Sequence, residues 1–313
     1  MKVLFMGTPD FAVPTLEKLI EHHEVVAVVT QPDKPNGRGK KILFSPVKEK
    51  ALANNIPLLQ PQKVRTNEFF EELKSYDADV FVVVAYGRIL PESILNLPKC
   101  GCLNIHGSLL PKYRGAAPIQ WAVINGENIT GVTIMYMDVG LDTGDIILQK
   151  EMKIEFDATS ATVHDEMSVL GAETLIQALI LIEQETVNRI KQDDSISTYA
   201  KPLTKEMGKI DFNKSTKEIL DLIRGLNPWP TAYAIYGCDD FTVKIWKAEI
   251  YDNSTKYQNG EIVELLPNKG IVVQASDGCI LITEIQATNS KRMKVSDYLR
   301  GHADAFSKIK NFS

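Results

Sequence analysis

The sequence predicts an α/β chain with two folded parts: a doubly wound, mostly parallel sheet covered by helices, followed by a small β-barrel. In residues 1–185, short apolar runs alternate with stretches of helical spacing, which is the pattern of βαβ units. In residues 207–313, short strand-like runs instead follow one another at turn-punctuated intervals. Residues 186–206 are polar and carry no strong periodicity, and we interpret them as a linker.

The composition of the 313 residues limits the class of protein. A hydrophobic content of 44% is enough for a sizeable core, and a net charge of −5 argues against general polyanion binding by the whole chain. The four cysteines include no C-x-x-C pair, so neither a zinc framework nor a disulfide scaffold is expected. No apolar run reaches the roughly 18 residues of a membrane span. We therefore expect a cytoplasmic protein with reduced thiols. A monomer is expected, although no sequence feature indicates the oligomeric state.

Taken in order, the first part alternates strands and helices. Apolar runs predict strands, and apolar residues at helical spacing predict helices. The expected strands are 3–6, 25–30, 79–85, 100–106 and 131–137, and the expected helices are 10–22, 46–54, 69–75, 116–125 and 161–182. Rossmann-like sheets of this kind bind ligands beyond the carboxyl ends of their strands. Gly7, Thr30, Tyr86 and His106 lie at such ends, so we expect the active crevice there.

The turn after the first strand does not fit a dinucleotide site. It reads Gly7-Thr8-Pro9-Asp10 and lacks the G-x-G-x-x-G pattern. Pro9 also removes an amide that could bind phosphate. We therefore favour a stiff strand-to-helix connection, in which Asp10 is suited to cap the helix.

The stretch CGCLNIHGSLLPKYRG, from Cys100 to Gly115, is the centre of the functional prediction. Side chains alternate along a strand, so Asn104 and His106 share one face and stand roughly 6.5–7 Å apart. That gap fits one small reacting group between an amide donor and an imidazole. The alternative is that both residues only cap the strand and hold the loop that begins at Gly107.

A basic stretch, QPDKPNGRGKKILFSPVK, lies between the second expected strand and the second expected helix. Its prolines and glycines predict a loop without regular structure. Four of its cations are candidate contacts to a polyanion: Lys34, Arg38, Lys40 and Lys41. Such a loop is either a solvated surface or, beside the crevice of an acidic protein, a clamp for a polyanionic substrate.

The sequence DVGLDTGDII follows the strand at 131–137 and places Asp138, Asp142 and Asp145 on one turn, made permissive by Gly140 and Gly144. Aspartates among glycines form Asx-turns or bind divalent cations. The run does not match the EF-hand pattern. We predict instead that one carboxylate reaches the His106 imidazole and fixes its tautomer. No metal is expected.

The second part begins with an expected helix at 215–226. Five strands are expected after it, at 231–236, 241–250, 260–265, 270–275 and 279–285, and they fit a barrel of the OB type. Trp229 and Trp246 are interpreted as core or linker packing rather than as platforms for base stacking. Five cations could form a basic face: Lys244, Lys247, Lys291, Arg292 and Lys294.

Two motifs together resemble a known family. Asn104-x-His106-Gly-Ser-Leu-Leu-Pro111, followed by Asp138-x-Gly-x-Asp142-x-Gly, is similar to the 10-formyltetrahydrofolate-dependent formyltransferases. The branch of that family that acts on methionyl-tRNA is resembled by further stretches: GTPDFAVP, QPDKPNGRGKK, SPVK, VVAYGRILP, KIDFNKSTKEILDLIRGLNPWPTAYA and KVSDYLRG. The resemblance thus covers nearly the whole chain.

The resemblance implies an enzyme that transfers the formyl group of 10-formyltetrahydrofolate to the α-amine of initiator methionyl-tRNA, for translation initiation. It implies a catalytic trio of Asn104, His106 and Asp142. Asn104 would donate to the tetrahedral oxyanion, an effect worth about 3–4 kcal/mol for comparable donors. His106 would move the proton of the amine, a contribution of roughly 10²–10⁴-fold, and Asp142 would hold and tune His106.

The folate site and the tRNA site follow from the same resemblance and from the position of the crevice. The candidate folate contacts are Ser108, Leu109, Leu110, Pro111, Tyr86, Gly87, Ile89, Asp138 and Gly140. The candidate tRNA contacts in the basic loop are Arg38, Lys34, Lys40 and Lys41, and the C-terminal barrel is also expected to bind tRNA.

Two alternatives remain open from the sequence. One is a formyltransferase that acts on a nucleotide-sugar amine or on glycinamide ribonucleotide, which would leave the basic loop and the barrel unexplained. The other is a non-catalytic RNA-binding protein on a degenerate Rossmann-like platform, which would not need Asn104, His106 and Asp142 together.

Overall fold

A computed structural model describes residues 1–36, 41–237, 241–253, 255–302, 304, 306 and 311–312. The contacts between residues divide the chain into two compact units. The first unit comprises Met1–Pro118, Ile129–Lys153 and His164–Ala200, and the second comprises Ile119–Asn128, Ile154–Val163 and Lys201–Ser313. Two short segments of the expected catalytic domain therefore have their contacts in the second unit, and residues 201–206 of the expected linker also belong to that unit. The division at 185 and 206 stays a prediction.

The first unit is built on a sheet that has, in the part of the chain that the structure describes, seven strands in the order β10-β9-β7-β6-β1-β2-β5. The strands are β1 (Lys2–Gly7), β2 (Glu24–Val29), β5 (Leu58–Leu59), β6 (Val80–Val84), β7 (Cys102–His106), β9 (Ile129–Tyr136) and β10 (Ile146–Lys153). The five from β7 to β5 pair in parallel, whereas β9 and β10 are antiparallel. The predicted mostly parallel, Rossmann-like sheet is confirmed.

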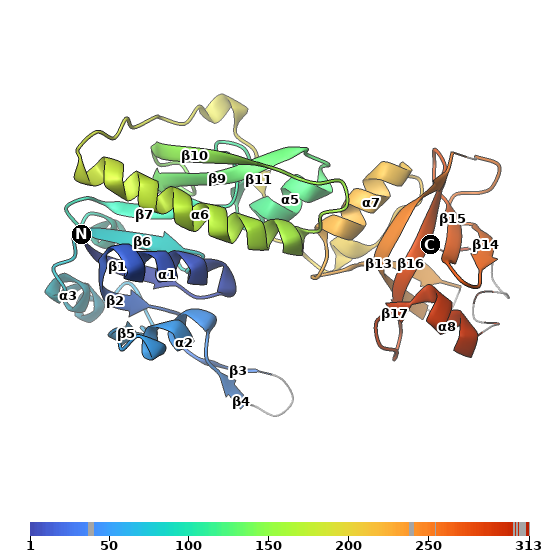
Figure 1. Ribbon diagram of the computed structural model, residues 1–313, viewed down its shortest axis with the longest axis horizontal. Coiled ribbons are helices and arrows are strands. Elements are labelled where there is room, and N and C mark those ends of the chain that lie inside the picture. The colour runs from blue at the N-terminus through green and yellow to red at the C-terminus, as the bar shows by residue number, and fades with distance from the viewer. Residues whose placement is uncertain are drawn as a thin grey trace. The chain divides into compact units, whose positions relative to one another are not determined.

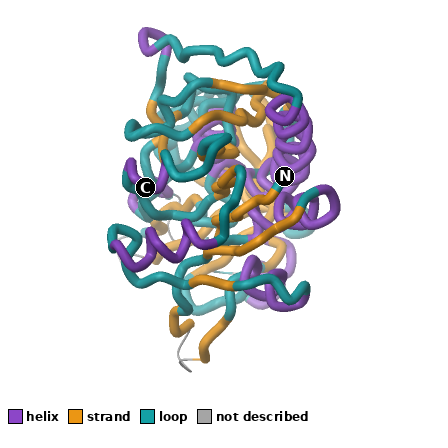
Figure 2. The backbone as a smooth tube through the Cα atoms, turned by 90° about the vertical axis from the view of Figure 1, so that its left-hand side faces the viewer, coloured by secondary structure: helices purple, strands orange, loops and turns teal. Residues whose placement is uncertain are grey.

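Helices cover both faces of this sheet, as Figure 2 shows. They are the 3-10 helix η1 (Asp10–Ala12), α1 (Val13–His22), α2 (Pro46–Ala53), α3 (Asn67–Ser75), α4 (Glu92–Leu95) and α6 (Ser160–Glu183). Hydroxyl side chains start α2 and α3, because Ser45 accepts the amide of Lys48 and Thr66 accepts the amide of Phe69. None of the helices in the described residues is both long and apolar enough to cross a membrane.

The alternation of side chains along β7 decides what faces the crevice. Ile105 lies on the face that α6 covers, where a Cβ atom on Gly171 would lie only 2.9 Å from the Ile105 Cγ2 atom. The absent side chain of Gly171 lets the helix approach the strand closely. Helix α6 lies over one face of the sheet (Figure 1), and by the alternation along β7 Asn104 and His106 belong to the opposite face.

The expectation that the basic loop lacks regular structure is wrong at both of its ends. β3 (Lys34–Asn36) and β4 (Lys41–Leu43) pair as an antiparallel hairpin, which extends away from the sheet of the first unit (Figure 1). Pro35 is compatible with this hairpin because each strand has a free edge, where a proline costs no ladder hydrogen bond. Residues 37–40 lie outside the described residues.

Much of residues 186–200, which the sequence assigned to a linker, packs into the first unit. β11 (Tyr199–Ala200) pairs in parallel with β8 (Arg114–Gly115), and a short 3-10 helix, η2 (Asp194–Ile196), precedes it. Ile190 forms an isolated antiparallel bridge with Ile146. The strands β8 and β11 are only two residues long, which explains why no periodicity reveals them.

The second unit contains an antiparallel sheet in the order β12-β13-β16-β15-β14, with β17 paired to β16. Its elements are α5 (Pro118–Ile124) apart from the first residue, η3 (Glu206–Gly208), α7 (Thr216–Gly225), β12 (Ala232–Tyr236), β13 (Phe241–Asp252), β14 (Ile262–Leu266), β15 (Gly270–Gln274), β16 (Cys279–Ala287), β17 (Met293–Lys294) and α8 (Val295–Gly301). Bridges from Phe312 to Tyr236 and from Asn311 to Glu261 connect the two edges. The sheet is thereby curled around one apolar core.

The two tryptophans predicted to be packing residues differ. Trp246 is half-buried and the Arg292 guanidinium lies 4.3 Å from the centre of its ring. Trp229 is 55% exposed, so of the two predicted roles, core or linker packing, core packing does not apply to it. It follows Pro228 in a turn and is not one of the residues that form the apolar core of the second unit.

Candidate active site

The strand β7 holds the two central side chains of the site at its carboxyl end. β7 lies inside the sheet, between β6 and β9, so its backbone is paired on both sides. His106 is only 6% exposed and Asn104 is half-buried. Within the described residues, no hydrogen bond ties the Asn104 side chain to the protein, which leaves its amide hydrogens available to a ligand.

The ring of His106 is held at one nitrogen. Its Nε2 atom lies 2.8 Å from the carbonyl oxygen of Tyr113. A carbonyl oxygen only accepts hydrogen bonds, so Nε2 carries a hydrogen and a neutral ring keeps its lone pair on Nδ1. That Nδ1 atom lies 3.7 Å from Oδ2 of Asp142, which is too long for a hydrogen bond but close enough for an ion pair when the ring is protonated. The Tyr113 carbonyl, rather than a carboxylate, thus fixes the tautomer.

Asp142 is held in place by its own turn and by the backbone of Gly115. The Gly115 amide donates to Asp142 Oδ2 over 2.8 Å. Asp142 itself adopts the left-handed conformation, with φ of 54°, whereas neither Gly140 nor Gly144 has a positive φ. Gly144 instead permits a close backbone approach, because a Cβ atom there would overlap the Tyr136 carbonyl. The expectation that these two glycines give the turn its unusual backbone conformation is therefore wrong. At Gly144 the missing side chain instead permits close packing.

Asp138 serves the same turn from its other end. Its Oδ1 atom accepts from the Gly140 amide at 2.7 Å and from the Thr143 hydroxyl at 2.8 Å. This is the Asx-turn that the sequence left open for these aspartates. Among the described residues, no group of three or more His, Cys, Asp or Glu side chains could hold a metal ion.

The arrangement brings three kinds of group to one place: an amide donor, a buried imidazole and a carboxylate. An amide donor stabilises negative charge on a carbonyl oxygen. An imidazole with a free lone pair removes a proton from an attacking nucleophile, and a nearby carboxylate stabilises the imidazolium that forms. Together these groups suit the transfer of an acyl-type group to an amine.

Comparison with known proteins agrees with this chemistry. Residues 1–179 match the model of the family described as formyl transferase, and residues 202–303 match the C-terminal domain of formyl transferase. These two matches cover most of the chain. It belongs to the formyl transferase family.

Curated relatives of this formyl transferase are similar over nearly their full length. The methionyl-tRNA formyltransferase of Ruminiclostridium cellulolyticum is 51% identical, and the match covers 96% of this chain and 97% of that protein. The methionyl-tRNA formyltransferase of Clostridioides difficile is 52% identical with the same coverage. The chain is therefore an enzyme of this family, which excludes the non-catalytic RNA-binding alternative.

Solved structures share the fold at low sequence identity. HypX from Aquifex aeolicus, crystallised with tetrahydrofolic acid, has a TM-score of 0.66 at 19% identity, over 99% of this chain and 48% of that chain. The N-formyltransferase from Helicobacter canadensis, crystallised with folinic acid and dTDP-3-aminofucose, has a TM-score of 0.65 at 22% identity, over 92% and 99% of the two chains. At these identities the likeness concerns the fold alone.

The loop after β7 holds four of the candidate folate residues, and the protein itself uses much of their polar capacity. The buried Ser108 donates its hydroxyl to the Lys112 carbonyl at 2.6 Å, and its own carbonyl accepts from the Thr133 hydroxyl at 2.6 Å. The Leu110 amide donates to the same Thr133 oxygen, and the Leu110–Pro111 bond is cis. These contacts fix the shape of the loop, whereas the half-buried Leu109 keeps part of its surface open.

Tyr86 and Gly87 follow the end of β6. The Tyr86 ring is buried, and this burial raises the pKa of its hydroxyl. Its carbonyl accepts from Gln31 Nε2 at 2.8 Å and from the Thr8 hydroxyl at 3.4 Å, so the protein itself already uses this backbone acceptor. Gly87 has φ of +75°, and a Cβ atom there would lie 2.5 Å from the same Gln31 nitrogen. A glycine is thus required at this turn.

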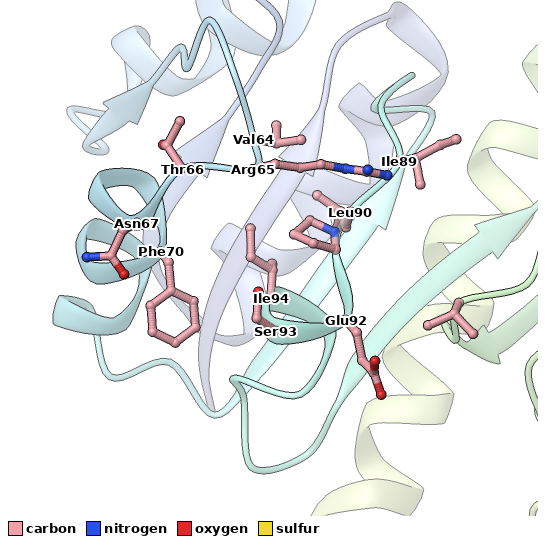
Figure 3. A pocket seen from close by; sticks show the side chains of 12 residues that line it. Val64, Arg65, Thr66, Asn67, Phe70, Ile89, Leu90, Glu92, Ser93 and Ile94 are labelled. Carbon is pink, nitrogen blue, oxygen red and sulfur yellow. The ribbon is translucent and has the colours of Figure 1, made fainter.

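Ile89 lines a pocket of about 580 Å³ in the first unit (Figure 3). Apolar side chains of Phe70, Leu90 and Ile94 form its wall, and Arg65 extends across one end toward Ile89. The remaining lining residues are Val64, Thr66, Asn67, Pro91, Glu92, Ser93 and Val139. Asn104, His106 and Asp142 are not among them, so these three side chains do not line this cavity.

The predicted tRNA contacts are largely beyond what the structure describes. Arg38 and Lys40 lie outside the described residues, and for Lys34 and Lys41 the structure describes only the backbone pairing of β3 with β4. At the base of this hairpin, Lys48 Nζ pairs with Asp33 Oδ2 at 2.5 Å. The hydrogen bonds from Lys48 and from Gln60 lower the pKa of the Asp33 carboxyl.

Sequence reasoning missed several residues that support the site: Tyr113, Arg114, Gly115, Gln192 and Thr198. Tyr113 and Gly115 act through their backbones, which carry no side-chain signal. Gly115 alone has a sequence feature that could have indicated a role, because a glycine marks a backbone position that other residues fill poorly. Its φ of +110° fits that reading.

Proposed function

We propose that this formyl transferase transfers the formyl group of 10-formyltetrahydrofolate to the α-amine of initiator methionyl-tRNA, giving the formylated aminoacyl-tRNA with which translation begins. Two relatives about half identical over nearly the whole chain carry the name methionyl-tRNA formyltransferase. The observation that carries the chemistry is the free amide of Asn104 beside a His106 ring whose Nδ1 atom faces Asp142 at 3.7 Å.

10-Formyltetrahydrofolate supplies the formyl group. Asn104 donates its amide hydrogens to the formyl oxygen, where negative charge develops as the amine attacks. Asn104 is half-buried on a strand paired on both sides, so its backbone is held in place before the reaction. A preorganised donor of this kind is worth about 3–4 kcal/mol of transition-state stabilisation.

His106 takes the proton of the attacking amine at Nδ1. The hydrogen on Nε2 is engaged by the Tyr113 carbonyl, so Nδ1 is the nitrogen left to act as a base. The protonated ring then has two favourable contacts, one to the Tyr113 carbonyl and one to the Asp142 carboxylate. The ring returns this proton to the nitrogen that leaves. Asp142 stabilises the imidazolium. The hydrogen bond from the Gly115 amide holds the Asp142 carboxylate in position.

The pocket lined by Ile89 suits the part of a folate that lies away from the formyl group. A folate combines flat aromatic rings with a carboxylate tail, and the pocket combines an apolar wall with Arg65, which makes no ion pair with any described residue. Its volume of about 580 Å³ is of the size usual for small-molecule sites. Ser108 to Pro111, Tyr86, Gly87, Asp138 and Gly140 are proposed to complete the folate site, and no metal is needed.

The basic hairpin is proposed to bind the tRNA through Arg38, with Lys34, Lys40 and Lys41. Its support is the density of cations in residues 34–41 of a chain whose net charge is −5. Phosphate contacts by such cations make binding salt-dependent. The barrel of the second unit is proposed to contribute further tRNA contacts, and the enzyme to act as a monomer in the cytoplasm, where translation takes place.

The test is formyl transfer from 10-formyltetrahydrofolate to radiolabelled methionyl-tRNA, with wild type beside His106→Ala. We expect labelled N-formylmethionine from the wild type and a loss of turnover of roughly 10²–10⁴-fold in the variant. A wild type that releases tetrahydrofolate without modifying methionyl-tRNA would instead favour the amino-sugar acceptor. A variant as active as the wild type would contradict the role of His106.

A further inference from the structure

We infer that Gln192 is a positioning residue of the active site, acting through Asp142 and Arg114. This inference rests on the proposed function, since it concerns the geometry of the proposed catalytic groups. Gln192 lies in the stretch that the sequence assigned to a linker, two residues beyond the bridge between Ile190 and Ile146. That bridge is closed by two backbone hydrogen bonds, of 2.8 and 3.0 Å, which fix where the segment passes the turn at 142–144.

The amide nitrogen of Gln192 holds the turn that carries Asp142. Nε2 donates to the carbonyl oxygens of Asp142 and Gly144, each over 2.8 Å. Both hydrogens of the amide are thus engaged by a single turn. Asp142 is in the left-handed region, with φ of 54°, a conformation that is uncommon for a residue other than glycine. The two hydrogen bonds stabilise the turn at this residue and two residues after it.

The amide oxygen of Gln192 holds the segment on the other side of the site. It accepts from Nε of Arg114 at 3.1 Å and from a terminal nitrogen of the same guanidinium at 2.9 Å. That guanidinium also reaches Asp194 at 2.7 Å. Since the Arg114 side chain is only 12% exposed, this contact lies largely out of solvent. Gln192 therefore connects two loops that do not pair with each other as strands.

The two loops, at 113–115 and at 142–144, are the ones that position His106 and Asp142. Tyr113, next to Arg114, accepts the hydrogen of His106 Nε2 through its carbonyl, and Gly115 donates to Asp142 Oδ2. Thr198 supports the same loop, because its hydroxyl accepts the Tyr113 amide at 2.8 Å and its carbonyl accepts the Arg114 amide at 2.9 Å. Gln192 thereby helps to set the distance between the imidazole and the carboxylate.

A substitution should remove the donors and keep the volume. Gln192→Glu keeps an acceptor for Arg114 and turns two donors into a carboxylate that faces the carbonyls of Asp142 and Gly144. Gln192→Met keeps the length without any hydrogen-bonding group, and serves if the charged variant does not fold. Gln184→Glu is the matched control, since Gln184 is exposed and its side chain makes no hydrogen bond within the described residues.

The measurement is steady-state formyl transfer to methionyl-tRNA by the full chain. Because a small misplacement of reacting groups costs up to about 10²-fold in rate, we expect both Gln192 variants to lose about 10–100-fold in kcat. The KM values for both substrates should stay within about threefold, since the substrates' binding groups are not touched. The Gln184 variant should match the wild type. A kcat of both Gln192 variants close to that of the wild type would overturn the inference.

A double-mutant cycle with Asp142→Asn separates positioning from a general loss of structure. If Gln192 acts through Asp142, adding Gln192→Met to Asp142→Asn should cost little further activity, because residues that act as one unit are not additive. Losses that multiply would overturn the inference. Should the wild type not act on methionyl-tRNA, the proposed function fails by itself. The ¹⁵N signals of the His106 ring, assigned with His106→Gln, then decide: they should change in Gln192→Met, and unchanged signals would overturn the inference.

Discussion

The carboxyl end of β7 and the segment at 190–200 serve the same site in different ways. At the end of β7, Asn104 and His106 stand two positions apart and share a face because side chains alternate along a strand. Gln192, by contrast, contacts residues 50 and 78 positions away, Asp142 and Arg114. The proposed catalytic groups Asn104 and His106 are thus close together in the sequence, whereas the distance from His106 to Asp142 depends on contacts remote in sequence.

The largest effect on kcat is expected at Asn104, at the carboxyl end of β7. Asn104→Ala removes the donor to the developing negative charge and should lower kcat by about 10²–10³-fold. The affinity for the folate should stay nearly the same, because this contact stabilises the transition state more than the bound substrate. Single-turnover formyl transfer and calorimetric binding of a folate analogue measure the two quantities.

Folate affinity is the observation that decides between the two roles of Asn104. If Asn104 only holds the loop that follows β7, then Asn104→Ala should weaken folate binding and activity together. That result would make Asn104 a structural residue and not a catalytic one, and would leave His106 as the main catalytic residue.

A smaller effect on kcat is expected at Gly115 in β8, where the segment at 190–200 pairs with this strand through β11. Gly115 has φ of +110°, and a Cβ atom there would lie 2.6 Å from Cε2 of Tyr199 and 2.8 Å from the carbonyl of Ala200. Gly115→Ala should therefore push β11 away from β8, move the amide that binds Asp142, and lower kcat by about 10–100-fold. The strain of such a position, on the order of 1–3 kcal/mol, should also lower the melting temperature.

Gly301→Ala is the matched control for this change. Gly301 lies at the end of α8, and a Cβ atom there would have no heavy atom within 4 Å. Kinetics and thermal unfolding of both variants should separate them clearly. A Gly115→Ala enzyme with the turnover of the wild type would mean that the pairing of β8 with β11 does not control the site.

The strands and helices that the sequence predicted correctly are those with a continuous apolar run or with apolar residues at helical spacing. β6, for example, is apolar at all five positions and is buried throughout. β10 was missed because its second half, with Lys150, Glu151 and Lys153, is polar and lies at the edge of the sheet. Charged residues protect such edges from further pairing, and they also hide the strand from a search for apolar runs.

The site divides in the same manner. Asn104, His106 and Asp142 were named from motifs, and the structure brings Asp142 to within ion-pair distance of His106. The Tyr113 carbonyl, which fixes the ring of His106, could not be named, because every residue has a carbonyl and only the fold decides which one faces the ring. Gln192 was hidden for a related reason, since its partners are mostly backbone atoms and its segment has no periodicity.

The smallest effect is expected on stability, at the start of α7 in the second unit, where the two residues that interact are close together in the sequence. Ser215 and Glu218 form a capping box, in which each side chain binds the backbone amide of the other. The hydrogen bonds from the Ser215 amide and hydroxyl, with Lys214 nearby, lower the pKa of Glu218 from 4.5 to about 2. A carboxyl with a lowered pKa stabilises the folded state above its ordinary pKa, and this contribution is lost as the pH falls toward about 2.

Glu218→Gln keeps an acceptor for the Ser215 amide and removes the charge. The variant should be slightly less stable than the wild type at pH 6, and the gap should narrow as the pH falls below about 4.5, because the unfolded wild-type chain then binds a proton at Glu218 that the folded protein does not bind until about pH 2. Urea unfolding of both proteins between pH 6 and pH 3 measures the gap, with Glu264→Gln as the control, since Glu264 is exposed and its side chain makes no hydrogen bond within the described residues. A gap that is constant with pH would show that the charge of Glu218 contributes nothing beyond its hydrogen bonds. A gap as large as that of Gly115→Ala would show that a contact between residues three positions apart matters as much as one between residues 85 apart.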